Sequence, residues 1–235
     1  QQIGYFPPVA LTGLIDLDSY IGKRIYFTSH DFIDEGEVGY FQLNADKSFE
    51  FYQDDELSDG NYQIFADNQA LLRDDTAFRY GKSFALLAES SNTAIAAFDR
   101  FIWPLFDVEA EATQYINSIT QSIPASNIDH LINQKVYMVD RDQDGAWVVT
   151  YLIFDTEKIT IYNDETFSVV ASTLDYTVTS EGMITLDGNS LFLSLVTDSF
   201  NVIVTDDVEN DSKDVNYFLF EHQKAIDFVH NANVF

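Results

Sequence analysis

The chain has 235 residues, with 39 Asp and Glu against 12 Lys and Arg, a formal net charge of −27 and no cysteine. Without cysteine there is no disulfide and no thiolate metal site, and the negative surface repels nucleic acid and anionic lipid. Hydrophobic residues make up 46% of the chain and aromatic residues 15%, which excludes a disordered protein and favours strands. No apolar run approaches the roughly 20 residues that a membrane-spanning helix needs.

A sequence repeat organises the chain. The segment Ile21–Tyr26 recurs as Ile132–Tyr137, a shift of 111 positions that pairs Tyr26 with Tyr137. The shift falls by one after the next turn, so that Phe49–Tyr52 corresponds to Ile159–Tyr162. Self-similarity at a fixed period predicts one structural unit built twice.

The repeat also predicts the domain boundaries. We divide the chain into a first unit at residues 11–118, a linker at 119–126 that contains Pro124, and a second unit at 127–235. The acidic residues follow the same division, with 20 of them in 9–118 and 19 in 126–235. Both units are therefore acidic over their whole surface, and the chain has no separate acidic tail.

In the first unit, short strands separated by turn signals are predicted at residues 24–28, 38–44, 49–51, 62–64, 70–73, 84–88 and 94–101. Phe49 and Phe51 alternate with Glu50, the period of a half-buried strand, so both rings should point into the core and Glu50 outward. Apolar residues then recur at helical spacing over residues 107–117, and Asp107 is the predicted N-cap.

The second unit repeats this order. Strands are predicted at residues 135–139, 147–154, 159–162, 176–178, 184–186, 191–196, 200–205 and 216–220, followed by a helix over 221–231. Ile159 and Ile161 should point into the core and Thr160 outward. The chain is thus predicted to be mainly β: two tandem antiparallel meander β-barrel units, each of seven to eight strands followed by a C-terminal helix. Two-sheet β-sandwich units are the alternative.

The start of the first strand carries Gly22-Lys23-Arg24. Lipocalins place Gly-x-Trp there; this chain keeps the glycine, has Arg24 in place of the tryptophan, and has Asn133 in place of the glycine in the second copy. Together with the barrel pattern, the chain resembles the lipocalin-like, calycin-type β-barrels that bacteria carry in secreted proteins. The resemblance implies a carrier that holds a small apolar ligand inside a barrel.

Tyrosines recur at matched positions of the two copies: Tyr26, Tyr40 and Tyr52, then Tyr137, Tyr151 and Tyr162. We interpret them as core packing and strand pairing. The functional alternative is an aromatic-lined barrel interior that takes a small apolar ligand.

One local motif predicts a metal site. Residues 140–145 read Asp-Arg-Asp-Gln-Asp-Gly, the form that opens a calcium loop, and carboxylates two residues apart can converge on one cation. We predict Asp140, Asp142 and Asp144 as calcium ligands. The position of the bidentate acid is Tyr151 and the flanks are predicted strands, so a solvated hairpin tip without metal is the alternative.

No nucleophile, phosphate-binding or dinucleotide motif is present, and the four histidines form no metal pair. The sequence therefore predicts a non-enzymatic binding or structural module of a secreted bacterial protein, located outside the cytoplasm in the medium, the periplasm or at the cell surface. Its start at Gln1 suggests a processed protein or an excised piece of a larger one. A carrier of a small apolar ligand is the alternative function, and a secreted hydrolase is a third. We expect a small ligand or an extracellular partner, with no nucleic acid and no membrane span.

Overall fold

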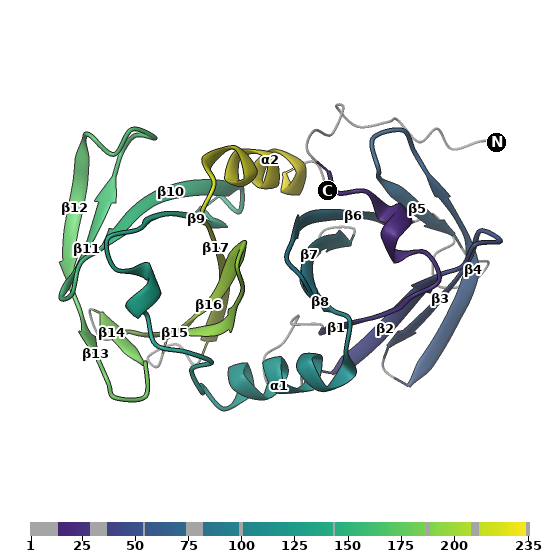
Figure 1. The fold of residues 1–235 in the computed structure, drawn as a ribbon, viewed down its shortest axis with the longest axis horizontal. Helices are drawn as coiled ribbons and strands as arrows, with labels where there is room; N and C mark the ends of the chain where they lie inside the picture. Colours follow the sequence, from purple (N-terminus) through teal and green to yellow (C-terminus); the bar gives the residue numbers. More distant parts are fainter. Residues whose placement is uncertain are drawn as a thin grey trace.

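The computed structural model describes residues 14–28, 37–53, 55–73, 82–98, 101–142, 144–186, 189–207 and 212–233. Over these residues, an eight-stranded closed barrel and helix α1 are followed by a nine-stranded curled sheet and helix α2 (Figure 1). Every pair of neighbouring strands is antiparallel. The predicted fold class, a mainly β chain of two meander units with a helix after each, is confirmed. The predicted chain division at residue 11 falls outside the described residues.

The elements have the following bounds. The first unit contains η1 (Leu17–Tyr20), β1 (Arg24–Thr28), β2 (Val38–Leu43), β3 (Ser48–Gln53), β4 (Glu56–Ile64), β5 (Ala70–Arg73), β6 (Lys82–Glu89), β7 (Thr93–Phe98), β8 (Phe101–Phe106) and α1 (Glu109–Thr120). The second unit contains η2 (Asp129–Leu131), β9 (Lys135–Arg141), β10 (Trp147–Phe154), β11 (Lys158–Tyr162), β12 (Val170–Asp175), β13 (Thr177–Val178), β14 (Ile184–Leu186), β15 (Asn189–Val196), β16 (Phe200–Asp207), β17 (Ser212–Leu219) and α2 (His222–Ala232).

The first unit closes into a barrel and the second does not. In the first unit β4 is continuous, and near Asn61 it passes from pairing with β3 to pairing with β5. In the second unit the chain leaves the strand conformation at Tyr176, so β12 pairs with β11 before this residue and β13 pairs with β14 after it. The sheet order therefore ends at β12 and β13, and the sheet curls without closing.

Two local predictions were wrong. Residues 94–101 do not form one strand, because β7 ends at Phe98 and β8 begins at Phe101 to pair back onto it. Pro104 is tolerated in β8 because β1 pairs with this strand only at Leu105 and Phe106, so the missing N–H breaks no bond to β1. Asp107 is not the N-cap of α1; its N–H bonds to the Asn92 carbonyl, and the cap falls on Val108.

Matched turns precede the first strand of each unit. Gly22 has φ +83° and its N–H donates to the Leu43 carbonyl at 2.7 Å; Asn133 has φ +62° and donates to the Phe154 carbonyl at the same distance. Asparagine is among the few residues that tolerate the left-handed region. The turn therefore keeps its shape although asparagine replaces the glycine.

A tyrosine also closes an equivalent turn in each unit. The Tyr62 hydroxyl donates to the Asn44 carbonyl at 2.8 Å, and the Tyr176 hydroxyl donates to the Asp155 carbonyl. Both tyrosines are buried. Each hydroxyl therefore ties the turn before the third strand of its unit, β3 or β11, to the end of the segment that pairs with that strand.

Stacked rings fill the closed barrel. Phe27 stacks on Phe51 at 5.0 Å and on Trp103 at 4.8 Å between ring centroids, and Phe98 stacks on Phe51 and Trp103, both at 5.2 Å. All four side chains are at most 7% exposed. The predicted inward orientation of Phe49, Phe51 and Ile159 is confirmed by their burial, and Ile161 packs partly buried against the second core.

A third core lies between the units. The outer faces of β6, β7 and β8 meet those of β9, β15, β16 and β17, while α1 and α2 lie on opposite sides of the junction (Figure 1). α1 covers β1, β2 and β8 and reaches β15, and α2 covers β9, β10 and β17 and reaches β6. The buried Tyr217 hydroxyl donates across the junction to the Ile102 carbonyl at 3.1 Å. We call this apolar cluster the junction core.

A lysine ties the second unit to the helix of the first. The Lys213 ammonium donates to the Ile119 carbonyl at 2.7 Å and to the Thr120 carbonyl at 3.2 Å, at the C-terminal end of α1. It also lies 3.9 Å from Asp206, which accepts a hydrogen bond from Ser122 at 2.5 Å. A cation at this end satisfies carbonyls that the helix leaves unpaired and complements its dipole.

The filled barrel predicts that Gly39 cannot carry a side chain. A Cβ at Gly39 would overlap the Phe27 ring and lie 2.6 Å from the Tyr52 carbonyl oxygen. Gly39→Ala should lower the free energy of unfolding by about 1–3 kcal/mol, measured by urea titration. Thr150, the matched residue in the second unit, is the control, and Thr150→Ala should cost less. Equal costs would mean that the barrel interior is not filled as described.

The tie at the junction predicts a second stability effect. Lys213→Met should lower the free energy of unfolding by about 1.5–3 kcal/mol, because it removes charged hydrogen bonds from a poorly exposed site. Lys224→Met is the control, since Lys224 is half-exposed and pairs with Glu221 three residues before it. A loss no greater than that of the control would contradict the role of Lys213.

Candidate functional site

The predicted calcium hairpin is closed by its own hydrogen bonds. The Asp142 carboxylate accepts the N–H of Asp144 at 3.0 Å and that of Ala146 at 2.9 Å, and Gly145 turns the chain with φ +82°. Among the described residues, no three His, Cys, Asp or Glu side chains are grouped to hold a metal ion, so Asp140, Asp142 and Asp144 are not brought together. Gln143 lies outside the described residues. Calcium binding here stays a prediction.

Asp140 lies apart from the hairpin tip and faces the concave side of the second sheet. Side chains alternate along β9: Val136 and Met138 belong to the core inside the second sheet, whereas Tyr137 and Val139 belong to the junction core. Asp140 continues the first series. Burial raises the pKa of Asp140 to about 6, and its Oδ1 is buried with no hydrogen bond from another described residue.

Strand register aligns the interiors of the two units. The pair Phe27–Leu105 between β1 and β8 corresponds to Met138–Phe218 between β9 and β17. By the same register Ala96–Trp103 corresponds to Ile203–Asn216, where the second unit places an amide instead of an indole. Equivalent layers of the two units can therefore be compared residue by residue.

This comparison shows that one layer of interior side chains differs between the two units. The first barrel fills it with four buried rings: Phe27, Phe51, Phe98 and Trp103. The second sheet has smaller residues at the matched positions, and each is half-buried: Met138, Ile161, Thr205 and Asn216. Below them, Leu193, Ile203 and Phe218 are buried as in the first barrel. We call the four half-buried residues together with Asp140 the concave layer.

The sequence alone already indicated part of this difference between the two interiors. The shift of the first strands already maps Phe27 on Met138 and Phe51 on Ile161. In the later strands the offset between matched residues of the two units differs, because loop lengths differ. Thr205 and Asn216 are therefore matched to the first unit only by the strand register. The sequence analysis missed the concave layer for this reason.

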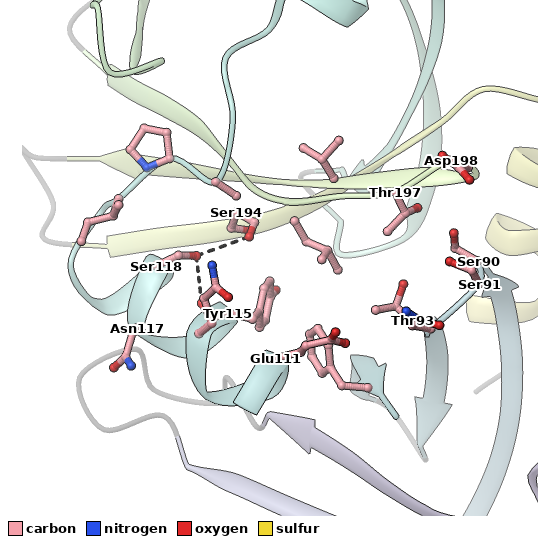
Figure 2. A pocket seen from close by; sticks show the side chains of 18 residues that line it. Ser90, Ser91, Thr93, Glu111, Tyr115, Asn117, Ser118, Ser194, Thr197 and Asp198 are labelled. Carbon is pink, nitrogen blue, oxygen red and sulfur yellow. Dashed lines mark hydrogen bonds between the residues drawn. The ribbon is translucent and has the colours of Figure 1, made fainter. Parts of the chain in front are cut away.

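A second candidate lies between the units. A groove of about 530 Å³ runs along α1 and is lined by the β6–β7 hairpin, the linker and the β15–β16 hairpin (Figure 2). Within the described part of the chain, its charged lining residues are Glu111 and Asp198. Burial raises the pKa of Tyr115 at its floor well above the usual range. The groove exists only because both units contribute walls to it.

Two of the histidines have polar partners in the second unit. His130 lies in a hollow of about 520 Å³ beside the start of β9 and the β15–β16 turn, where its Nε2 is 2.7 Å from the Asn201 amide. The amide donates, so the ring is neutral, and burial lowers the pKa of His130. His222 lies 3.4 Å from Glu165 beside the Tyr137 ring. Neither ring bonds a hydroxyl among the described residues, and His30 lies outside them.

The matched tyrosines form a ladder on the outer face of each unit. Strand pairing places Tyr40 between Tyr26 and Tyr52, and Tyr151 between Tyr137 and Tyr162. In the second unit the Phe167 ring packs edge-on against all three. The ladders therefore serve strand pairing and outer packing, and they do not line a barrel interior.

Comparisons with known proteins identify no family. No protein-family model matches the chain, and no curated protein matches it. A solved structure of MrkH, described as a novel c-di-GMP dependent transcription regulatory factor, is 10% identical, and the comparison covers 87% of this chain and 80% of that chain. Its TM-score is 0.13, which carries no argument about fold or function. No helix among the described residues is long and apolar enough to cross a membrane.

The buried carboxyl predicts a pH effect. The pKa of Asp140 is raised from 3.8 to about 6, so the folded protein binds this proton more tightly than the unfolded chain does. The contribution of Asp140 to the free energy of unfolding therefore falls as the pH rises from 3.8 through about 6. Asp140→Asn should stabilise the fold by about 1 kcal/mol at neutral pH, after allowance for solvent screening, and by almost nothing near about pH 4.

Thermal melts across this pH range test the effect. Asp144→Asn changes the same charge at an exposed position of the same hairpin and serves as the control. A gain for Asp140→Asn that is equal at both pH values would contradict the buried position of this carboxyl.

Proposed function

We propose that the protein is a non-enzymatic binding module of a secreted bacterial protein, in which the first barrel is a filled scaffold and the second sheet takes a small ligand. The observation that carries this proposal is the concave layer. Where the first barrel holds four buried rings, the second sheet exposes smaller side chains above an apolar floor. Binding sites for small molecules are concave, mostly apolar and fitted with few polar groups.

The chemistry of the concave layer suggests the ligand class. The rings of the first barrel show that this layer of the fold accommodates flat apolar groups. Met138 and Ile161 supply apolar walls, while Asp140 supplies a poorly solvated carboxylate. A buried carboxylate is costly without a partner. We therefore propose a ligand with a flat apolar body and an amino group that pairs with Asp140.

The alternatives have less support. A carrier with one ligand in each barrel is disfavoured for the first unit, because its stacked rings occupy the interior. The matched turns at Gly22 and Asn133, and at Tyr62 and Tyr176, support two copies of one fold whose interiors have diverged. A hydrolase lacks support in the described residues, because no histidine bonds a nucleophile there. Location outside the cytoplasm stays a prediction from the sequence.

Three naphthalene probes test the proposal. 2-Naphthylmethylamine, 2-naphthylmethanol and 2-naphthoate share one ring system and differ in charge. The amine should bind saturably with one site per chain, about tenfold tighter than the alcohol, and the acid should not bind. Naphthalene fluorescence and calorimetry measure the affinities. Absence of saturable binding, or equal binding of amine and acid, would contradict the proposal.

Variants locate the binding. Asn216→Trp introduces the residue of the matched position in the first barrel and should abolish binding, and Met138→Phe is a second variant of the same kind. Asp140→Asn should reduce the affinity of the amine to that of the alcohol. Asp144→Asn removes the same charge from an exposed position and should change neither the affinity of the amine nor that of the alcohol. Unchanged binding in folded Asn216→Trp and Met138→Phe would place the ligand elsewhere.

A further inference from the structure

The groove between the units has a fixed wall. The Ser118 hydroxyl donates to the Tyr115 carbonyl at 2.9 Å and to the Ser194 carbonyl at 3.4 Å, which ties α1 to β15 (Figure 2). The N–H of Ala125 in the linker donates to the Leu193 carbonyl at 2.7 Å. The bonds to the Ser194 and Leu193 carbonyls cross from the first unit and the linker to the second unit. The groove is therefore held in shape by the junction itself.

Other polar groups of the groove remain available. The side chains of Ser91, Asn92, Gln114, Glu111 and Asp198 make no hydrogen bond or ion pair with another described residue. They come from the β6–β7 hairpin, from α1 and from the β15–β16 hairpin. Figure 2 shows Ser91 and Thr93 on one hairpin, Thr197 and Asp198 on the other, and Glu111 on the helix around one end of the groove. Hydroxyl, amide and carboxylate groups from three elements thus surround one space.

The charge of this space has one sign. Among the residues that the structure describes, no Lys, Arg or His lines the groove, and the two charged residues that do are acids. The whole chain carries −27, so its field adds to the local charge and repels anions. Glu111 is half-buried, which weakens the screening of its charge by water. The groove therefore selects a cation.

The cation is organic rather than a metal ion. In the described part of the chain no three acidic or histidine ligands are grouped, as a metal site requires. The volume of about 530 Å³ lies within the range of small-molecule sites, roughly 300–1,000 Å³. Hydroxyl and amide groups suit a ligand with many hydroxyls, and the apolar side chains of Leu195 and Ile123 suit its carbon skeleton.

We infer that the groove between the two units binds a small hydroxylated amine of the amino-sugar class, whose ammonium group is attracted by the negative charge of Glu111 and Asp198. The groove shares no residue with the concave layer, so this inference does not rest on the proposed function of the second sheet. The two sites can be tested and can fail separately.

Three sugars of one ring type test the inference. Glucosamine carries a cation at about pH 6, glucose is neutral, and glucuronate is an anion. Calorimetry and NMR titration of the full chain, in about 0.15 M salt to screen the general surface field, should show saturable binding of glucosamine with one site. Glucose should bind at least about fivefold more weakly, and glucuronate should not bind. Equal binding of the three sugars, or no binding of glucosamine, would overturn the inference.

A matched pair of variants separates the groove from the general acidity. Glu111→Gln should weaken glucosamine binding about fivefold and leave glucose unchanged. Glu109→Gln makes the same change in the first turn of the same helix, at an exposed position outside the groove, and should have no effect. Equal losses in both variants would assign the binding to the surface field and overturn the inference.

A steric variant locates the site without changing charge. Ser91 lies exposed at the groove and makes no bond that the fold needs, so Ser91→Trp should fold and should block glucosamine. Its melting temperature checks the fold. Full glucosamine affinity in this variant would show that the sugar binds elsewhere.

Discussion

The junction core is the feature on which the other features depend. Neither α1 nor α2 belongs to one unit alone, because each covers its own sheet and also contacts the other. The outer faces of β6 to β8 and of β15 to β17 would be exposed apolar surface in isolated units. Burial of that surface supplies the driving force for association, and Tyr217 and Lys213 then fix how the units meet. The groove along α1 is a consequence of this fixed arrangement.

The two units place matched turns around two different interiors. Large stacked rings fill the core of the first barrel. Gly39, which has no side chain, leaves room for the Phe27 ring. The second unit has Thr150 and Met138 at these positions, and its layer above the apolar floor is half-exposed. A well-packed core tolerates little change in volume. A unit that rests against such a core through a large apolar junction can leave part of its own interior unfilled.

The acidic residues have several separate structural roles. Asp142 and Asp164 accept backbone N–H groups of their own turns. The hydrogen bond from the Thr166 hydroxyl, together with these backbone bonds, lowers the pKa of Asp164 to about 2. Asp206 takes part in the tie at the junction. Asp140 in the concave layer and Glu111 in the groove have no such partner among the described residues. Both candidate sites therefore favour a cationic group, although they are built from different elements.

The sequence alone determined the features that depend on local pattern. The repeat and the alternation at Phe49, Phe51 and Ile159 gave the meander units, the closing helices and the buried faces, because strand and helix periods are properties of neighbouring residues. It did not determine the break at Tyr176 or the hairpin inside residues 94–106. It also missed that α1 begins after Asp107, because the N–H of Asp107 bonds to the carbonyl of Asn92. The concave layer and the groove depend on strand register and on the junction between the units. Those contacts join residues far apart in the chain, so only the tertiary structure decided them.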